Sequence, residues 1–215
     1  MTKTLLSIGH GFSARALTPL LQYAGWDVIG TTRSAEKAAD LAKTGVTPLV
    51  WPGTDLAPYL DQASHLLISA GPNEDGDPFL AEYSANALDL AWVGYLSTTG
   101  VYGDHNGGWV DETTPLTPGT KRGRHRVMAE QQWQAMHLPL HIFRLAGIYG
   151  PGRGPFAKVR SSTARRIIKK NQIFSRIHVD DIAQVVLASI TKPNPGAIYN
   201  LCDDCLLYTS PSPRD

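Results

Sequence analysis

The chain has 215 residues, 42% of them hydrophobic, and its 20 basic and 19 acidic residues leave a formal net charge of +1. This length fits one α/β domain with a small additional lobe, and the hydrophobic fraction excludes a disordered chain. The near-zero net charge disfavours a globally basic nucleic-acid-binding protein, and no apolar run approaches the ~20 residues that span a bilayer. The first residues do not resemble a secretory signal, and two cysteines are too few for a disulfide framework, so we expect a cytoplasmic protein.

Short apolar runs alternate with segments of helical periodicity. In chain order we predict a strand at 4–8, a helix at 14–24, a strand at 27–31, a helix at 34–43, strands at 46–51 and 65–70, a helix at 78–90, a strand at 92–98, a helix within 117–136 and a strand at 140–145. This alternation predicts an α/β fold in which a parallel, doubly wound sheet of the Rossmann type carries helices on both faces. The Pro/Gly-rich stretch 147–155 predicts a boundary between a first domain, 1–150, and a smaller, incomplete C-terminal lobe, 151–204, which also holds the last sheet elements.

The last eleven residues, CLLYTSPSPRD at 205–215, match one reading frame of a transposase sequencing adapter in full. We therefore expect this tail to be an assembly artefact and the natural chain to continue after Asp204. The alternative is a genuine Pro/Ser-rich tail. If the tail is an artefact, Cys205 should not be paired with Cys202 as a redox or metal motif.

A glycine-rich turn follows the first predicted strand. The sequence GHGFSA at 9–14 fits G-x-G-x-x-G/A, the pattern that joins the first strand of a dinucleotide-binding unit to its first helix. Gly9 permits the tight turn, Gly11 lets the backbone approach a pyrophosphate, and Ala14 allows close packing of helix on strand, while the helix N-terminus attracts the anion. The residues predicted to contact a dinucleotide here are Gly9, Gly11, Phe12, Ser13, Ala14, Ala70 and Gly71.

The end of the second predicted strand distinguishes between two dinucleotides. An Asp or Glu about 20 residues after the glycines would bind the ribose 2′-hydroxyl of NAD, but no carboxylate is present at this position. Instead, Arg33 can bind a 2′-phosphate through its planar guanidinium, and Thr32 adds a hydroxyl donor. We therefore predict NADP as the cofactor, with NAD as the alternative; Arg33 is otherwise a solvated arginine at a strand end.

Three further segments carry a family resemblance: STTGVYGD at 97–104, RLAGIYGPGR at 144–153 and IHVDDIA at 177–183. Together with the glycine motif they resemble the extended short-chain dehydrogenase/reductase family, the group of NAD(P)-dependent epimerases and dehydratases. The resemblance implies an NAD(P)-binding Rossmann domain at 1–150, a substrate lobe after it, and hydride transfer between NAD(P) and a carbon bearing a hydroxyl, often on a nucleotide-linked sugar. Thr98, four residues before the Tyr of V-Y-G, corresponds to the family's Ser or Thr that polarises the substrate oxygen.

The chain departs from this family at the Tyr-x-x-x-Lys pair. Arg122 stands in place of the Tyr and Arg126 in place of the Lys, since Gly123 and Glu130 hold the register. Arginine does not exchange its proton usefully, so the sequence resembles an atypical branch that keeps the cofactor fold and lacks the Tyr. Four residues apart, Arg122 and Arg126 should share a helix face towards the cleft and stabilise oxyanion charge there.

Other residues could donate a proton in place of the missing Tyr. The candidates are His125, Tyr102, Tyr149 and His178, each of which is equally explained as a packed or solvated side chain.

Basic residues are concentrated in two short segments. The segments 121–126 and 158–176 contain 11 of the 20 basic residues and no acid, which indicates either an anionic substrate or solvated helix faces. Nucleic acid is disfavoured because Phe174 is the only aromatic residue among them. Two functional hypotheses follow: an NADP-dependent oxidoreductase or epimerase acting on an anionic, sugar-like small molecule, or a catalytically silent NADP-binding sensor on the same fold. We expect no metal, nucleic-acid or membrane partner, and a homodimer is left open.

Overall fold

A seven-stranded sheet forms the centre of the molecule, which we describe from a computed structural model covering residues 3–83, 89–154, 159–163, 173–204 and 207–208. Its strands are β1 (Thr4–Ile8), β2 (Asp27–Thr32), β3 (Thr47–Val50), β4 (His65–Ile68), β5 (Trp92–Thr98), β6 (Leu140–Leu145) and β10 (Ile198–Leu201). They lie in the order β10-β6-β5-β4-β1-β2-β3, and every neighbouring pair is parallel. The strand order reverses between β1 and β4, which is where doubly wound sheets bind ligands. The predicted Rossmann-type α/β fold is confirmed.

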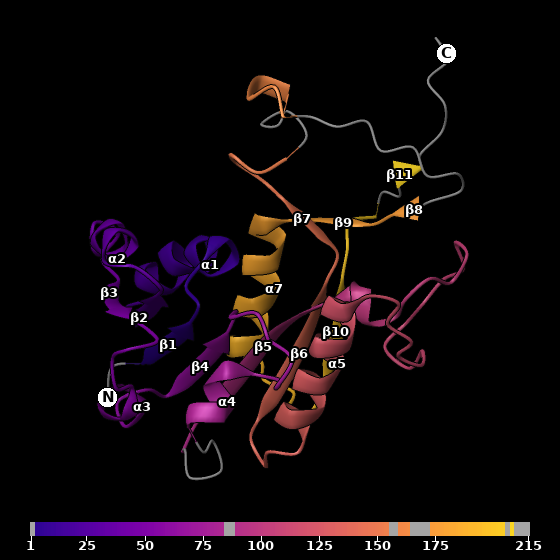
Figure 1. The fold of residues 1–215 in the computed structure, drawn as a ribbon. Helices are drawn as coiled ribbons and strands as arrows, with labels where there is room; N and C mark the ends of the chain where they lie inside the picture. Colours follow the sequence, from indigo (N-terminus) through magenta and orange to yellow (C-terminus); the bar gives the residue numbers. More distant parts are fainter. Residues whose placement is uncertain (1–2, 84–88, 155–158, 164–172, 205–206, 209–215) are drawn as a thin grey trace.

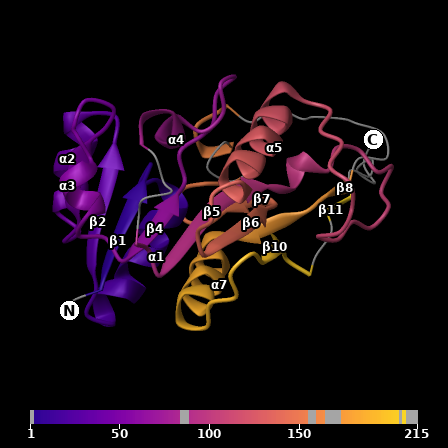
Figure 2. The ribbon, with the colours of Figure 1, turned by 90° about the horizontal axis from the view of Figure 1, so that it is seen from below.

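Helices cover both faces of this sheet (Figures 1 and 2). They are α1 (Phe12–Tyr23), α2 (Ala35–Ala42), α3 (Ala57–Leu60), α4 (Pro78–Glu82), α5 (Lys121–Gln134) and α7 (Val179–Thr191), with a short 3-10 helix, η2 (Thr99–Val101), after β5. Figure 2 shows α1 and α7 on one side of the sheet and α4 and α5 on the other. Each side has its own apolar core, with Leu17 and Val186 buried in the first and Phe79 and Trp133 in the second.

A smaller group of strands lies beyond the carboxyl ends of the main sheet, at the top of Figure 1. Strand β7 (Gly147–Tyr149) pairs in parallel with β9 (Arg176–His178), and β8 (Ile173–Phe174) pairs antiparallel with β11 (Leu207–Tyr208). Strand β11 belongs to the tail at 205–215, most of which lies outside the described residues, as do five of the seven basic residues of the 158–176 segment. The artefact origin of the tail and the domain boundary at residue 150 stay predictions.

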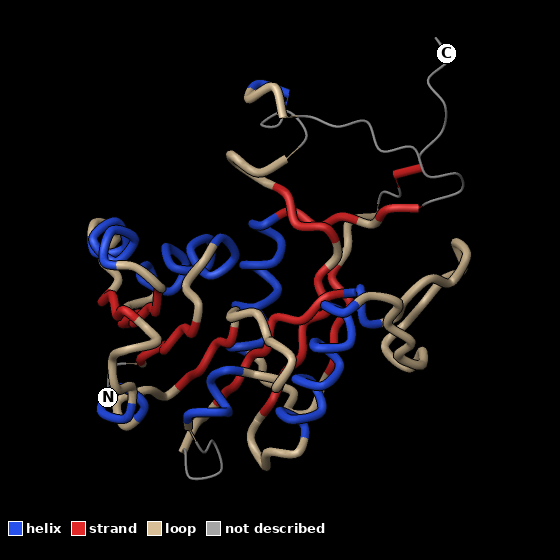
Figure 3. Tube along the Cα trace, viewed as in Figure 1, coloured by secondary structure: helices blue, strands red, loops and turns tan. Residues whose placement is uncertain are grey.

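Helices α3 and α7 are not among the predicted elements, and α4 is shorter than the helix predicted at 78–90. Helix α7 and strand β10 follow the smaller strands and return to the main sheet, where α7 packs against α1 (Figure 3). Helix α4 ends at Glu82 because Tyr83 has an extended backbone, with φ −122° and ψ 130°. In the described part of the chain, no helix has both the length and the apolar character needed to cross a membrane.

Two buried histidines should make the fold sensitive to acid. Burial, and secondarily the charge of Lys3, lowers the pKa of His65 to about 4, and burial together with Arg15 lowers that of His10 to about 4, against an ordinary value of 6.5. Between pH 4 and pH 6.5 these histidines bind more protons in the unfolded chain than in the folded one. The stability that the neutral histidines contribute is therefore complete above pH 6.5 and falls as the pH drops towards 4.

We expect the free energy of unfolding to decrease by up to about 3 kcal/mol per histidine across this window. Urea unfolding at about pH 7.5, 6 and 4.5 measures the decrease, and a His10→Gln, His65→Gln double variant should show a smaller slope. A wild-type free energy that stays constant from pH 7.5 to 4.5 contradicts this prediction.

Candidate functional site

The glycine loop between β1 and α1 lies directly against the end of β4. Gly9 has φ +76°, and a Cβ there would lie 2.8 Å from the backbone nitrogen and 3.0 Å from the Cα of Ala70. Only glycine both adopts this positive φ without strain and leaves room for the Ala70 backbone so close to its Cα. The loop is also attached to β2, because the Gly9 N–H donates to Thr31 Oγ1 at 2.7 Å and the His10 N–H donates to the Thr31 carbonyl at 2.8 Å. The loop is thereby held at the point where the strand order reverses.

The second loop glycine, by contrast, faces open space. A Cβ on Gly11 would meet only the Gly9 carbonyl, at 3.6 Å. Gly11 is the N-cap of α1, and no side chain bonds to the N–H groups of the first turn. Uncapped N–H groups at a helix N-terminus attract anions, and Gly11 leaves room for one to approach them.

A cavity of about 180 Å³ opens in front of this loop. It is lined by Gly9, Gly11, Phe12, Ser13, Ser69, Leu96, Ser97, Arg126, Leu145, Ile148 and Arg153. Among the described residues of this lining, the charged ones are Arg126 and Arg153, and none is a carboxylate. Ser69 Oγ is buried without a hydrogen-bond partner among the described residues. A positively charged cavity in front of an uncapped helix N-terminus fits the diphosphate of a dinucleotide.

The other predicted cofactor-binding residues are not among those that line this cavity. Ala14 is buried in α1, and Ala70 and Gly71 follow β4. Thr32 is the last residue of β2, and Arg33 follows it with an exposed side chain. No carboxylate stands at this strand end, since the chain continues with Ser34 as the N-cap of α2.

Arg126 reaches from α5 to the end of β5 at the cavity wall. Its Nη1 donates to the Leu96 carbonyl at 2.6 Å and to the Tyr95 hydroxyl at 3.1 Å. The other terminal nitrogen of Arg126, Nη2, would lie 4.0 Å from a Cβ placed on Gly71, so the guanidinium extends towards the end of β4. Burial raises the pKa of the Tyr95 phenol despite the charge of Arg126 beside it, which leaves Tyr95 a neutral hydroxyl.

The remaining predicted catalytic residues, Arg122 and Thr98, are not among those that line the cavity. Arg122 is exposed in the first turn of α5 and is not part of the cavity lining. Thr98 is the N-cap of η2 and accepts the Gly100 N–H at 3.2 Å, which leaves its hydroxyl proton available to a ligand. Ser97, and not Thr98, lines the cavity.

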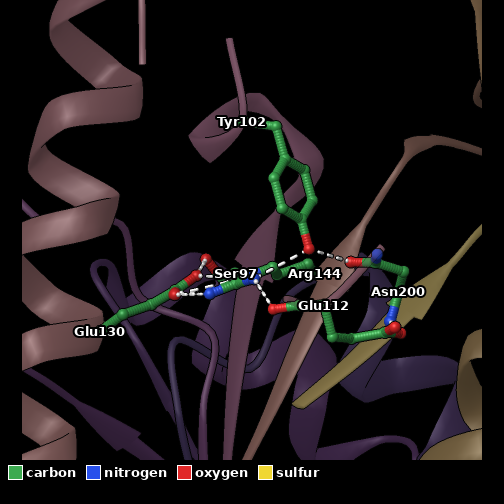
Figure 4. Close-up of polar contacts among 6 residues, drawn as sticks. All are labelled: Ser97, Tyr102, Glu112, Glu130, Arg144 and Asn200. Atoms are coloured by element: carbon green, nitrogen blue, oxygen red, sulfur yellow. Dashed lines mark hydrogen bonds and ion pairs between the residues drawn. The ribbon is translucent and has the colours of Figure 1, made fainter. Parts of the chain in front are cut away.

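A buried polar network that the sequence analysis did not identify stands behind the cavity (Figure 4). Arg144 of β6 forms an ion pair with Glu130 of α5, with 2.8 Å between Nη2 and Oε2, and the two side chains are only 4% and 1% exposed. Ser97 Oγ donates to Glu130 Oε1 at 2.5 Å, so the hydroxyl oxygen faces the cavity without a free proton. Burial alone would lower the pKa of Arg144, but hydrogen bonds with Glu130 and Tyr102 outweigh it and raise the pKa above its ordinary value.

Tyr102, one of the alternative proton donors, belongs to this network. Its hydroxyl accepts a hydrogen bond from Arg144 Nη1 at 2.8 Å and donates to Asn200 Oδ1 at 2.8 Å, and the residue is 2% exposed. The backbone N–H of Asn200 in turn donates to Glu112 Oε1 at 2.7 Å. These bonds commit the Tyr102 hydroxyl proton to Asn200.

The other candidate donors lie elsewhere. His125 is half-buried on α5. The rings of Tyr149 and His178 are 5.0 Å apart in an edge-to-face arrangement, and His178 Nδ1 accepts the Asp180 N–H as the N-cap of α7. Within the described ranges, no group of three or more His, Cys, Asp or Glu residues is placed to hold a metal ion.

The parallel sheet, its helices and the glycine loop at the strand-order reversal together define a Rossmann-type α/β protein. The model of the NAD dependent epimerase/dehydratase family matches residues 80–202, more than half of the chain. The chain belongs to this family, as the sequence resemblance predicts.

Individual proteins and solved structures are also similar to the chain. The chain is similar to Protein YeeZ of Escherichia coli K12, with 28% identity over 218 residues, 93% of this chain and 77% of YeeZ. It is also similar to the solved structure of a functionally unknown conserved protein from Silicibacter pomeroyi DSS, with a TM-score of 0.90 and 58% identity, covering 97% of this chain and 75% of that one. The structure of MoeE5 in complex with UDP-glucose and NAD has a TM-score of 0.77 at 18% identity, covering 95% and 78% of the two chains, and is similar in fold alone.

Proposed function

We propose that the chain binds NADP(H) in the cavity in front of the glycine loop and acts as an oxidoreductase or epimerase on an anionic, sugar-like small molecule. The observation that carries the proposal is a cavity that joins the uncapped N-terminus of α1 to two arginines and contains no carboxylate. When bound, the nicotinamide supplies a site that accepts or donates hydride. Family membership and the NAD in the MoeE5 structure support a nicotinamide dinucleotide in general.

The proposal assigns the parts of the dinucleotide to the chain's own residues. Gly9, Gly11 and the first turn of α1, with Phe12, Ser13 and Ala14, would hold the diphosphate. Thr32 and Arg33 would hold the 2′-phosphate, and Ala70 and Gly71 would border the cofactor at the end of β4. Arg126, whose Nη1 is committed to β5, would offer its other terminal nitrogen to a ribose hydroxyl or a substrate oxygen.

The specificity for NADP depends on Arg33. We expect Arg33→Ala to weaken NADPH binding about 10- to 100-fold and to leave NADH binding unchanged, because hydrogen bonds to charged groups contribute about 1.5–3 kcal/mol and NADH has no 2′-phosphate. Calorimetric titration of both cofactors measures this, with Arg124→Ala, an exposed arginine of α5, as the matched control. Equal affinities for NADPH and NADH in the wild-type chain would contradict the NADP assignment.

For the chemical step, we assign polarisation of the substrate oxygen to Thr98, because its hydroxyl accepts the Gly100 N–H and keeps its proton for a ligand. Arg126 would stabilise negative charge that develops on that oxygen, and Arg122, exposed at the start of α5, would meet the outer, anionic part of the substrate. Neither arginine can act as the acid or base of the Tyr-x-x-x-Lys mechanism.

A specific observation favours a second candidate, a catalytically silent NADP-binding sensor. Among the described residues, the cavity lining offers serines and arginines but no Tyr, Lys or His to exchange a proton. A screen with phosphorylated and carboxylated sugars decides between the two. It follows NADPH absorbance for net oxidation or reduction and the sugar isomers by NMR for epimerisation, because an epimerase returns the hydride and leaves the NADPH absorbance unchanged. Turnover that is lost in Thr98→Ala supports the enzyme, whereas tight NADPH binding without turnover of any of these substrates supports the sensor.

A further inference from the structure

We propose that Arg153 is a cofactor ligand that contacts the dinucleotide diphosphate beside the N-terminus of α1. This inference rests on the proposed function and adds a binding residue that lies outside the glycine motif. Arg153 lines the same cavity as Gly9, Gly11 and Ser13, although it follows them by about 140 residues in the sequence.

A tight turn fixes the backbone of Arg153 beside the glycine loop. The N–H of Gly150 donates to the Arg153 carbonyl and the N–H of Arg153 donates to the Gly150 carbonyl, both at 2.9 Å. Gly150 has φ +154°, and a Cβ there would lie 3.3 Å from Phe12 Cζ and 2.7 Å from Val179 Cγ1. The turn is therefore packed between the first residue of α1 and the start of α7.

The side chain of Arg153 is held over the loop but has no anionic partner. Its guanidinium carbon lies 5.2 Å from the centroid of the Phe12 ring, within the range of a cation–π contact. Among the described residues no carboxylate forms an ion pair with Arg153, and no acid lines the cavity.

Two positive features thus face one cavity, the guanidinium of Arg153 and the N-terminus of α1. They repel each other unless an anion lies between them. The planar guanidinium fork matches the geometry of phosphate oxygens, and a diphosphate offers oxygens to both sides at once. The same chemistry would accept free pyrophosphate, so the test separates a dinucleotide from an inorganic anion.

The experiment compares wild-type chain, Arg153→Ala and Arg153→Lys in titrations with NADH, ADP, pyrophosphate and adenosine. NADH avoids any contribution from a 2′-phosphate site at Arg33. We expect Arg153→Ala to weaken the binding of NADH and ADP about 10- to 100-fold. The binding of adenosine, which has no phosphate, should weaken less than about twofold. Arg153→Lys keeps the charge but loses the planar fork, so its affinity for NADH should fall between those of the other two chains. Pyrophosphate binding tighter than that of NADH would overturn the assignment to a dinucleotide.

Arg15→Ala provides the matched control, because it removes a positive charge from the same helix at a position that borders a different hollow. An unchanged NADH affinity in Arg153→Ala, or an equal loss in Arg15→Ala, overturns the inference while leaving the proposed function intact. A wild-type chain that binds none of NADH, NADPH and ADP overturns the proposed function as well. Arg153 is exposed, so equal thermal midpoints should show that the variants fold alike.

Discussion

Replacing Glu130 with Gln should lower the free energy of unfolding by about 3–5 kcal/mol, because it leaves the charge of Arg144 buried without a counter-charge. The two side chains are 1% and 4% exposed, and Glu130 receives hydrogen bonds from both Arg144 and Ser97. A loss of this size is a large fraction of the total stability of a domain. Urea unfolding monitored by tryptophan fluorescence measures it.

Two further variants keep this prediction testable. Ser97→Ala removes only one hydrogen bond to the same carboxylate and should cost about 1 kcal/mol, so it reports on the network even where Glu130→Gln fails to fold. Asp40→Asn breaks an ion pair of similar length, 2.8 Å, that is exposed on α2, and should leave the unfolding midpoint nearly unchanged. Equal midpoints for the wild-type chain and Glu130→Gln would show that the buried pair contributes little.

Gly11→Ala should abolish dinucleotide binding without weakening the fold. The added Cβ has ordinary van der Waals space, since its nearest neighbour is 3.6 Å away, but it occupies the opening through which a diphosphate approaches α1. We expect NADPH affinity to fall by more than about 100-fold, corresponding to about 3 kcal/mol. Calorimetry and a thermal melt on the same sample separate the two effects.

Gly9→Ala, in the same loop, should affect stability as well as binding and is therefore compared with Gly11→Ala. Its Cβ would meet the backbone of Ala70 at 2.8 Å, and its φ of +76° costs a non-glycine residue about 1–2 kcal/mol before the clash is counted. This variant should therefore lose stability as well as binding. Normal NADPH binding by Gly11→Ala would place the cofactor somewhere other than the glycine loop.

Local patterns allowed much of the fold to be predicted. The apolar run at Thr4–Ile8, the glycines after it and the helical spacing of Leu17 and Leu21 located β1, the loop and α1. The expected alternation of strands and helices matched the parallel sheet because the central strands β1, β4, β5 and β6 are buried on both faces and are rich in apolar residues. Helix α7 was missed, although its first residues lie in a recognised motif and its buried residues, such as Ile182 and Val186, follow helical spacing.

The polar network behind the cavity could not be predicted by the same means. Its members, Ser97, Tyr102, Glu112, Glu130, Arg144 and Asn200, come from separate elements and meet only in the folded chain (Figure 4). One signal was present: Arg144 is a charged residue within the predicted strand 140–145, and a charge buried in a central strand requires a partner. Arg153 was equally hidden, because nothing in its own segment indicates that the turn at 150–153 packs on Phe12.

Hydrogen–deuterium exchange of the wild-type chain with and without saturating NADPH tests most directly the claim that this cavity is a dinucleotide site. The account predicts slower exchange in three segments that are distant in sequence: the glycine loop and first turn of α1, the residues that follow β4, and the turn at 150–153. Unchanged exchange in the glycine loop, or protection confined to another part of the molecule, would contradict it.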